Sequence, residues 1–179
     1  MSSVRKIEWL SPEDYLVEET NSEVRHQYVG GATGRMTNDT ARHNRVVGNL
    51  FSIIKKTLEH SDCQTFISDM KVRAASAFYY PDVVVTCEPL APEAVYLDKP
   101  KLIIEVLSKS TEGRDRLEKW TAYRTLEPLQ EYVLVAQGRH EIDVYRRTSD
   151  GWKQISFGAD ETLELECIGL EIPMAEIYR

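Results

Sequence analysis

Apolar side chains recur at helical spacing in one long segment and gather in short runs elsewhere, and the two patterns predict helices and strands respectively. After Asn38 and Asp39, either of which can cap a helix, apolar residues lie three and four positions apart until about Glu59. The members of this stripe are Val47, Leu50, Phe51, Ile54 and Leu58. This spacing predicts a long helix with one buried face, and His43 extends that face by one turn.

Other helices are predicted mainly by their capping residues. Ser11, Pro12 and the acids that follow are typical of a helix start, so we expect a helix over residues 12–19. Ser110 or Thr111 can cap another helix over residues 112–126. On that helix Asp115, Lys119 and Tyr123 share one face. A last helical turn is expected over residues 173–177.

Runs rich in β-branched and aromatic residues predict strands between these helices. Residues 27–29 and 32–36, on either side of Gly30 and Gly31, are expected to form a hairpin. Residues 63–66 and 68–72 are expected to form either one strand or a bent pair of strands. Further strands are expected over residues 79–86, 102–107, 132–136, 141–147 and 152–157. The order of elements predicts one α/β domain over residues 1–179, with a central mixed β-sheet flanked by helices.

One predicted strand holds a carboxylate, Glu105, among five aliphatic residues. Burying an unpaired charge costs several kcal/mol, so Glu105 requires a partner. Asp82 stands at the entry of a neighbouring apolar strand, and Lys119 follows on the next helix. Paired carboxylates favour a divalent cation such as Mg²⁺, to which the backbone carbonyl after Glu105 can add an oxygen. A lysine beside such an ion can orient a water molecule or stabilise charge on a phosphate.

Composition narrows the function classes. The 179 residues are 42% hydrophobic and 28% charged, which is ordinary for a soluble globular protein. The net charge of −7 argues against indiscriminate coating of nucleic acid, although residues 35–56 hold five basic residues and one acid. Without an apolar run of about 18 residues or a signal-like start, we expect no membrane segment. Three scattered cysteines argue against a disulfide framework and favour a reducing compartment, the cytoplasm.

The residues of this candidate site resemble those of the PD-(D/E)XK nucleases. More narrowly, the chain resembles a widespread bacterial family of restriction-endonuclease-like proteins over about residues 7–147. The resemblance is carried by a Pro-Asp strand entry, a Glu-Val-Leu-Ser strand and a helical Asp-x-x-x-Lys, with an upstream Arg-His-Gln-Tyr-Val-Gly-Gly segment. In this chain these are Pro81-Asp82, Glu105-Val106-Leu107-Ser108, Asp115 with Lys119, and residues 25–31.

The resemblance implies the restriction-endonuclease-like fold and a metal-dependent endonuclease that hydrolyses DNA phosphodiester bonds. Asp82 and Glu105 would hold Mg²⁺, with Mn²⁺ as a substitute, and Lys119 would orient the attacking water. A homodimer is implied by the resemblance alone. Three departures stand out: Leu107 occupies the superfamily's lysine position, Gln27 and Ala32 replace acids common in the family, and Lys109 replaces a proline.

Several alternatives remain open at the level of sequence. The protein could be a catalytically inactive nuclease fold that binds DNA or a protein partner, or a glycosidase that uses Asp82 and Glu105 as acid and base. Asp82 could be a turn residue, Glu105 half of a buried ion pair, and Lys119 an exposed partner of Asp115. Candidate auxiliary residues are Gln27, His43 and Ser108, with packing as the alternative role of His43. Candidate phosphate contacts are Arg42, Arg45, Lys109 and Arg114.

Overall fold

The structure, a computed structural model that describes residues 9–36, 40–108 and 112–179, is built around a mixed sheet of six strands. Its strand order is β11-β10-β9-β8-β6-β3. Among the described strands of this sheet, only β8 and β9 pair in parallel. Its strands are β3 (Gln64–Ile67), β6 (Val83–Thr86), β8 (Leu102–Leu107), β9 (Glu131–Ala136), β10 (Ile142–Thr148) and β11 (Gly151–Phe157).

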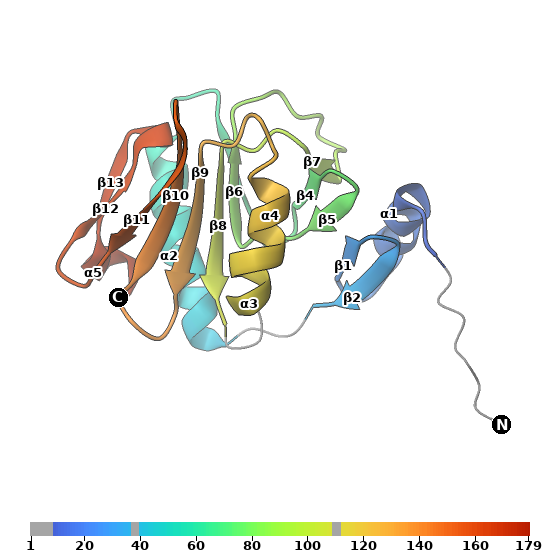
Figure 1. Cartoon of the computed structure of the whole chain (residues 1–179), viewed down its shortest axis with the longest axis horizontal. Coiled ribbons are helices and arrows are strands. Elements are labelled where there is room, and N and C mark those ends of the chain that lie inside the picture. Colours follow the sequence, from blue (N-terminus) through green and yellow to red (C-terminus); the bar gives the residue numbers. More distant parts are fainter. Residues whose placement is uncertain (1–8, 37–39, 109–111) are drawn as a thin grey trace.

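Helices cover both faces of this sheet, as Figure 1 shows. On one face lies α2 (Ala41–Thr57), and on the other lie α3 (Glu112–Arg114), a π-helical turn η1 (Asp115–Lys119) and α4 (Trp120–Tyr123). The side chains of β8 alternate between these layers. Ile104 and its alternate neighbours pack on the α2 side, whereas Ile103 and Leu107 pack with Tyr123 on the α4 side.

A smaller sheet adjoins the first and has the order β2-β1-β5-β4-β7. Its strands are β1 (His26–Val29), β2 (Ala32–Arg35), β4 (Lys71–Ala74), β5 (Ala77–Tyr79) and β7 (Tyr96–Leu97). The helix α1 (Pro12–Thr20) packs on it through a cluster of Tyr15, Tyr28 and Phe78. In Figure 1 α1 and the β1–β2 hairpin lie together at the right of the molecule.

The C-terminal segment packs into the same hydrophobic core as α2. It consists of β12 (Thr162–Leu165), a 3₁₀ turn η2 (Glu166–Ile168), β13 (Leu170–Pro173) and α5 (Met174–Ile177). Leu163, Ile172 and Ile177 are buried in the same core as the apolar stripe of α2. No helix among the described residues is long and apolar enough to cross a membrane.

Most of the predicted elements are present, and the α/β fold with helices flanking a mixed sheet is confirmed. The helix cap predicted at Asn38 or Asp39 lies outside the described residues, and the Thr40 hydroxyl caps α2 by accepting from the His43 N–H. The β12–β13 hairpin was not predicted.

The single strand predicted over residues 79–86 is wrong. The chain forms β5 and β6 instead, and these belong to different sheets. Pro81, between them, has no N–H to donate, so a ladder cannot continue through it. The segments predicted at 63–66 and 68–72 are likewise split between the two sheets, as β3 and β4.

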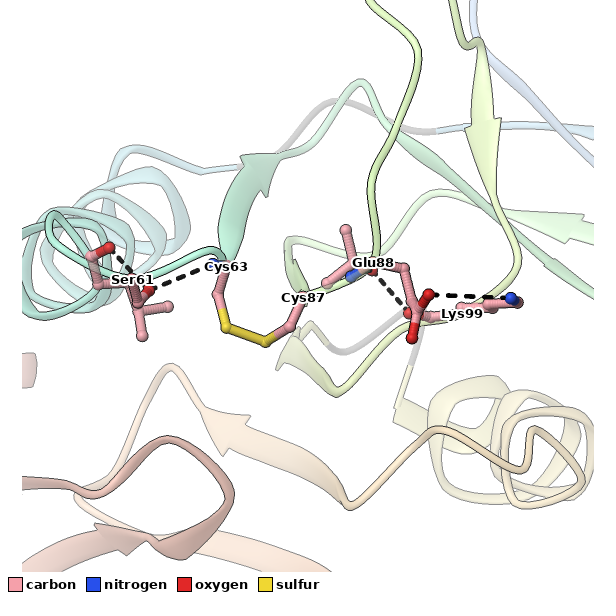
Figure 2. Close-up of a disulfide and its surroundings, with 7 residues drawn as sticks. Ser61, Cys63, Cys87, Glu88 and Lys99 are labelled. Carbon is pink, nitrogen blue, oxygen red and sulfur yellow. Dashed lines mark hydrogen bonds and ion pairs between the residues drawn. A yellow bond between two sulfur atoms is a disulfide. The ribbon is translucent and has the colours of Figure 1, made fainter.

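The scattered cysteines were interpreted as evidence against a disulfide framework, but Cys63 and Cys87 form a disulfide (Figure 2). The antiparallel register of β3 and β6 places Gln64 opposite Thr86, so Cys63, just before β3, faces Cys87, just after β6. A separation of 24 residues gives no hint of this pairing in the sequence. The argument from cysteine spacing to a reducing compartment therefore does not hold.

Candidate active site

Asp82 and Glu105 meet where β6 and β8 pair. These strands are antiparallel with Val83 opposite Ile104, so Asp82, one residue before β6, comes opposite Glu105. The Asp82 Oδ2 accepts a 2.6 Å hydrogen bond from the Val106 N–H, which joins it to the glutamate strand. The Asp82 side chain is 16% exposed, so solvent reaches this end of the site.

Lys119 completes the site from the helical layer above β8. Its Nζ lies 2.8 Å from the Glu105 Oε1 and 2.9 Å from the Asp115 Oδ1. All three side chains are no more than 4% exposed. The sequence interpretation of Lys119 as an i, i+4 partner of Asp115 is therefore right in its pairing and wrong in placing the pair at the surface.

The helix carrying Lys119 contains a π-helical turn from Asp115 to Lys119. Residues four apart in an α-helix are offset by about 40° around the axis. A π turn takes more residues per turn and reduces this drift, and such turns occur often at functional sites. Asp115, Lys119 and Tyr123 consequently all stay on the buried face.

The electrostatics of this cluster are unbalanced, because the Lys119 ammonium faces several carboxylates. Burial raises the pKa of Glu105 well above its ordinary value, and the charges of Asp115 and Asp82 add to the increase, against the opposing effect of Lys119. Burial alone would lower the pKa of Lys119, but Glu105 and Asp115 more than offset it and raise that pKa. Lys119 is thus firmly cationic, and the cluster has excess negative charge when its acids are ionised.

Tyrosine hydroxyls fix the geometry of the cluster. The Tyr123 hydroxyl donates to the Glu105 Oε1 over 3.4 Å. The Tyr132 hydroxyl, on β9, donates to the backbone carbonyl of Asp115 over 2.9 Å and so anchors the π turn. The position of Tyr123 eight residues after Asp115 hinted at its role. Nothing in the sequence near Tyr132 indicated that it would support this turn.

His43 reaches the site from α2, on the opposite face of the sheet. Its Nε2 lies 3.0 Å from the Val106 carbonyl oxygen and 3.3 Å from the Asp82 Oδ2. The side chain is buried, as the helical stripe predicted. His43 therefore packs in the core and also lies beside Asp82, one of the candidate catalytic acids.

The structure places the other candidate residues on several different elements. Gln27 is buried on β1, and its Oε1 accepts a 3.4 Å hydrogen bond from the Arg114 guanidinium. Ser108 directly follows β8, and Leu107 is buried in the core as its apolar side chain requires. Arg42 and Arg45 are exposed on the first turns of α2. Lys109 lies outside the described residues.

Arg116 ties the π turn to the sheet below. Its Nη1 donates a 2.8 Å hydrogen bond to the Asp143 Oδ2 of β10, and its Nε donates to Glu112. Asp143 in turn accepts from the Ser156 hydroxyl on β11. This network was not foreseen, because nothing in the sequence brings residue 116 to residues 143 and 156.

The donor atoms present suit a hard cation that keeps some of its water. No set of three or more His, Cys, Asp and Glu side chains gathers to hold a metal ion among residues 9–36, 40–108 and 112–179. The oxygens of Asp82 and Glu105 and the carbonyl of Val106 lie at one strand end. Mg²⁺ typically binds through one or two carboxylates and retains several waters, so the residues fit this ion.

Comparisons with known proteins agree with this architecture. A crystal structure described as that of a putative nuclease belonging to DUF820, from Anabaena variabilis ATCC 29413, superposes with a TM-score of 0.74. The superposition covers 94% of this chain and 97% of that one at 15% identity, which shows a shared fold.

Two uncharacterized proteins of Synechocystis sp. (strain ATCC 27184 / PCC 6803 / Kazusa) are similar in sequence. One is 36% identical over 174 residues, covering 95% of this chain and 92% of the relative. The other is 29% identical over 166 residues, covering 88% of this chain and 92% of the relative. A family model named Uma2, with the description "Putative restriction endonuclease", matches residues 12–175. The chain therefore belongs to the Uma2 family of restriction-endonuclease-like proteins.

Proposed function

We propose that this protein is a metal-dependent endonuclease that hydrolyses DNA phosphodiester bonds. The observation that carries the proposal is the convergence of Asp82, Glu105 and Lys119 at one end of the β6–β8 pair. Membership of the Uma2 family and the fold shared with the Anabaena protein described as a putative nuclease support the same reaction class.

Asp82 and Glu105, with the Val106 carbonyl, would hold Mg²⁺ or its substitute Mn²⁺. When bound, such an ion supplies Lewis-acid stabilisation of charge on the phosphate and on the leaving oxygen. Burial and the charges of the neighbouring acids disfavour the ionised form of Glu105. A divalent cation would favour that form, so the excess negative charge of the cluster favours binding of such an ion.

Lys119 is suited to orienting the attacking water and to stabilising negative charge beside the scissile phosphate. Asp115 holds its ammonium in place, and the two tyrosines hold Glu105 and the π turn. Arg42, Arg45 and Arg114 are exposed and would contact the phosphates of DNA. Cleavage of both strands would be served by the homodimer that the family resemblance implies.

A second candidate is a nuclease fold that binds DNA or a protein without cutting. The observation in its favour is Gln27, which occupies a position where an acid is common in the family. Its side chain accepts a hydrogen bond from Arg114 and adds no carboxylate to the site.

Cleavage assays on duplex DNA test the proposal. Wild type should cut with Mg²⁺ or Mn²⁺ and not with EDTA, because the Lewis acid is then removed. Asp82→Asn and Glu105→Gln, which keep the side-chain shape, should each lower the rate by about a hundredfold or more. The matched control is Asp98→Asn, an acid in a surface pair with Arg73, which should cut at the wild-type rate.

Three outcomes separate the alternatives. DNA binding without cleavage by the wild type, in either metal, would favour the non-catalytic candidate. Cleavage that persists in EDTA would contradict the metal dependence. Equal rates for wild type, Asp82→Asn and Glu105→Gln would remove both carboxylates from the mechanism.

A further inference from the structure

The backbone of Val106, whose carbonyl is a candidate metal donor, lies where the ladder between β6 and β8 ends. These strands pair with Val83 opposite Ile104, so two residues further along β8 the same register brings Val106 opposite Pro81. The Val106 N–H donates to the Asp82 side chain, so the polar backbone groups of this residue point toward β6. Proline has no N–H, and it therefore cannot continue the ladder by donating to the Val106 carbonyl.

Two side chains take the place of the missing strand partner of Val106. The Asp82 Oδ2 accepts from its N–H over 2.6 Å. Its carbonyl oxygen lies 3.0 Å from the Nε2 of His43, and this nitrogen is also 3.3 Å from the Asp82 Oδ2. Both of these oxygens are acceptors, so we assign a proton to the Nε2 of His43, which donates to the carbonyl. His43, Val106 and Asp82 are thus linked pairwise.

Packing alone does not require a histidine at this position of α2. Val47 and Leu50, which follow His43 on the same helical face, are apolar and buried in the core. Burial of a polar ring costs free energy unless its polar atoms form hydrogen bonds. The contacts that the Nε2 of His43 makes are with two of the oxygens that were identified above as donors suited to Mg²⁺.

We propose that His43 is a positioning residue of the metal site, whose Nε2–H holds the Val106 carbonyl and the Asp82 carboxylate in place for a divalent cation. The inference rests on the proposed function, and it adds α2 to a site that is otherwise built on β6, β8 and the helix of Lys119. Groups that orient metal ligands without binding the metal typically contribute about tenfold to a hundredfold to metal affinity or activity. His43 is thus expected to act on the affinity for the cation, through the two donors it contacts.

Binding of Mn²⁺ in the absence of DNA tests this role separately from catalysis. His43→Leu keeps apolar bulk and removes the donor, so it should weaken Mn²⁺ binding in isothermal titration calorimetry by about tenfold or more. His43→Gln, whose amide nitrogen can occupy the place of Nε2, should bind within about threefold of the wild type. In cleavage assays the Mg²⁺ concentration that gives the half-maximal rate should change in the same order. If His43→Leu does not fold, His43→Asn replaces it, because its shorter amide reaches only the place of Nδ1.

Val47→Ala is the matched packing control, because Val47 is buried one turn further along the same face of α2. It should lower the melting temperature and leave the Mn²⁺ affinity unchanged, which separates lost packing from a lost donor. Equal Mn²⁺ affinities for wild type and His43→Leu, or equal losses in His43→Leu and His43→Gln, overturn the inference, while metal-dependent cleavage by the wild type leaves the proposed function standing. If the wild type neither binds Mn²⁺ nor cuts DNA, the proposed function and this inference fail together.

Discussion

Glu105 illustrates how one residue can be stabilised by a structure and still be poised for a ligand. Its carboxylate is buried, accepts from Tyr123 and pairs with Lys119, yet burial and the neighbouring acids keep its pKa raised. A single lysine is shared between Glu105 and Asp115. The charge that remains uncompensated is what an added cation would neutralise.

The raised pKa of Glu105 predicts a specific pH dependence of stability. A folded state that holds a proton more tightly than the unfolded state is most stable below the ordinary pKa, and ionisation at higher pH opposes folding. The free energy of unfolding of the wild type should therefore fall relative to Glu105→Gln as pH rises above about 4.5. The slope should not exceed about 1.4 kcal/mol per pH unit. Urea unfolding at several acidic to neutral pH values measures it.

Two comparisons make this prediction sharp. Added Mg²⁺ should reduce the pH dependence of the wild type, because the cation favours the ionised carboxylate. Glu93→Gln, which removes an exposed glutamate of the β6–β8 connection, should leave it unchanged. Parallel stability curves for wild type and Glu105→Gln at every pH would contradict the prediction.

At the scale of elements, the π turn determines whether Asp115 reaches Lys119. Deleting Leu117, which is 72% exposed, should convert the turn to α-helix and rotate the residues before it by about 100° relative to those after it. Tyr123 is fully buried and should hold the later part in place. Asp115 would then leave the site, and the DNA cleavage rate should fall by about a hundredfold.

The matched control for this deletion is Leu117→Ala, which keeps the length of the helix. Because the side chain is exposed, stability should change by no more than about 0.5 kcal/mol and cleavage should be unaffected. Full activity of the deletion variant would show that the π turn has no part in the reaction.

Local sequence signals predicted those features that depend on local periodicity. The helical stripe of α2 and the buried carboxylate in β8 could be predicted because the apolar residues around them follow a strict pattern. The π turn was not, because the spacing of Asp115, Lys119 and Tyr123 also fits an α-helix. Arg116 and Tyr132 were missed for another reason, since their partners are set by the crossover between β8 and β9.

At the scale of the whole molecule, the sequence did not predict how the strands divide between the two sheets. Among the described strands the chain changes sheet several times, including between β3 and β4 and between β5 and β6. Alternation within a strand gives its faces but not its partner strands, so these changes of sheet were not foreseen. The change between β5 and β6 places Asp82 directly before β6 and opposite Glu105. On the other side of β6, its antiparallel pairing with β3 brings Cys63 next to Cys87.

The disulfide predicts how the whole molecule responds to reduction. Closing a loop with a sequence separation of 24 stabilises the folded state by about 3 kcal/mol through the entropy of the unfolded chain. Reduction with dithiothreitol should therefore lower the urea midpoint of the wild type to that of a Cys63→Ser/Cys87→Ser double variant. The double variant should not respond to the reductant, and Cys167→Ser should respond as the wild type does.

DNA cleavage below the unfolding transition should be unchanged, because Asp82 precedes β6 whereas Cys87 follows it. A wild-type midpoint that is the same in both conditions, once thiol titration verifies reduction, would contradict a stabilising role of this bond.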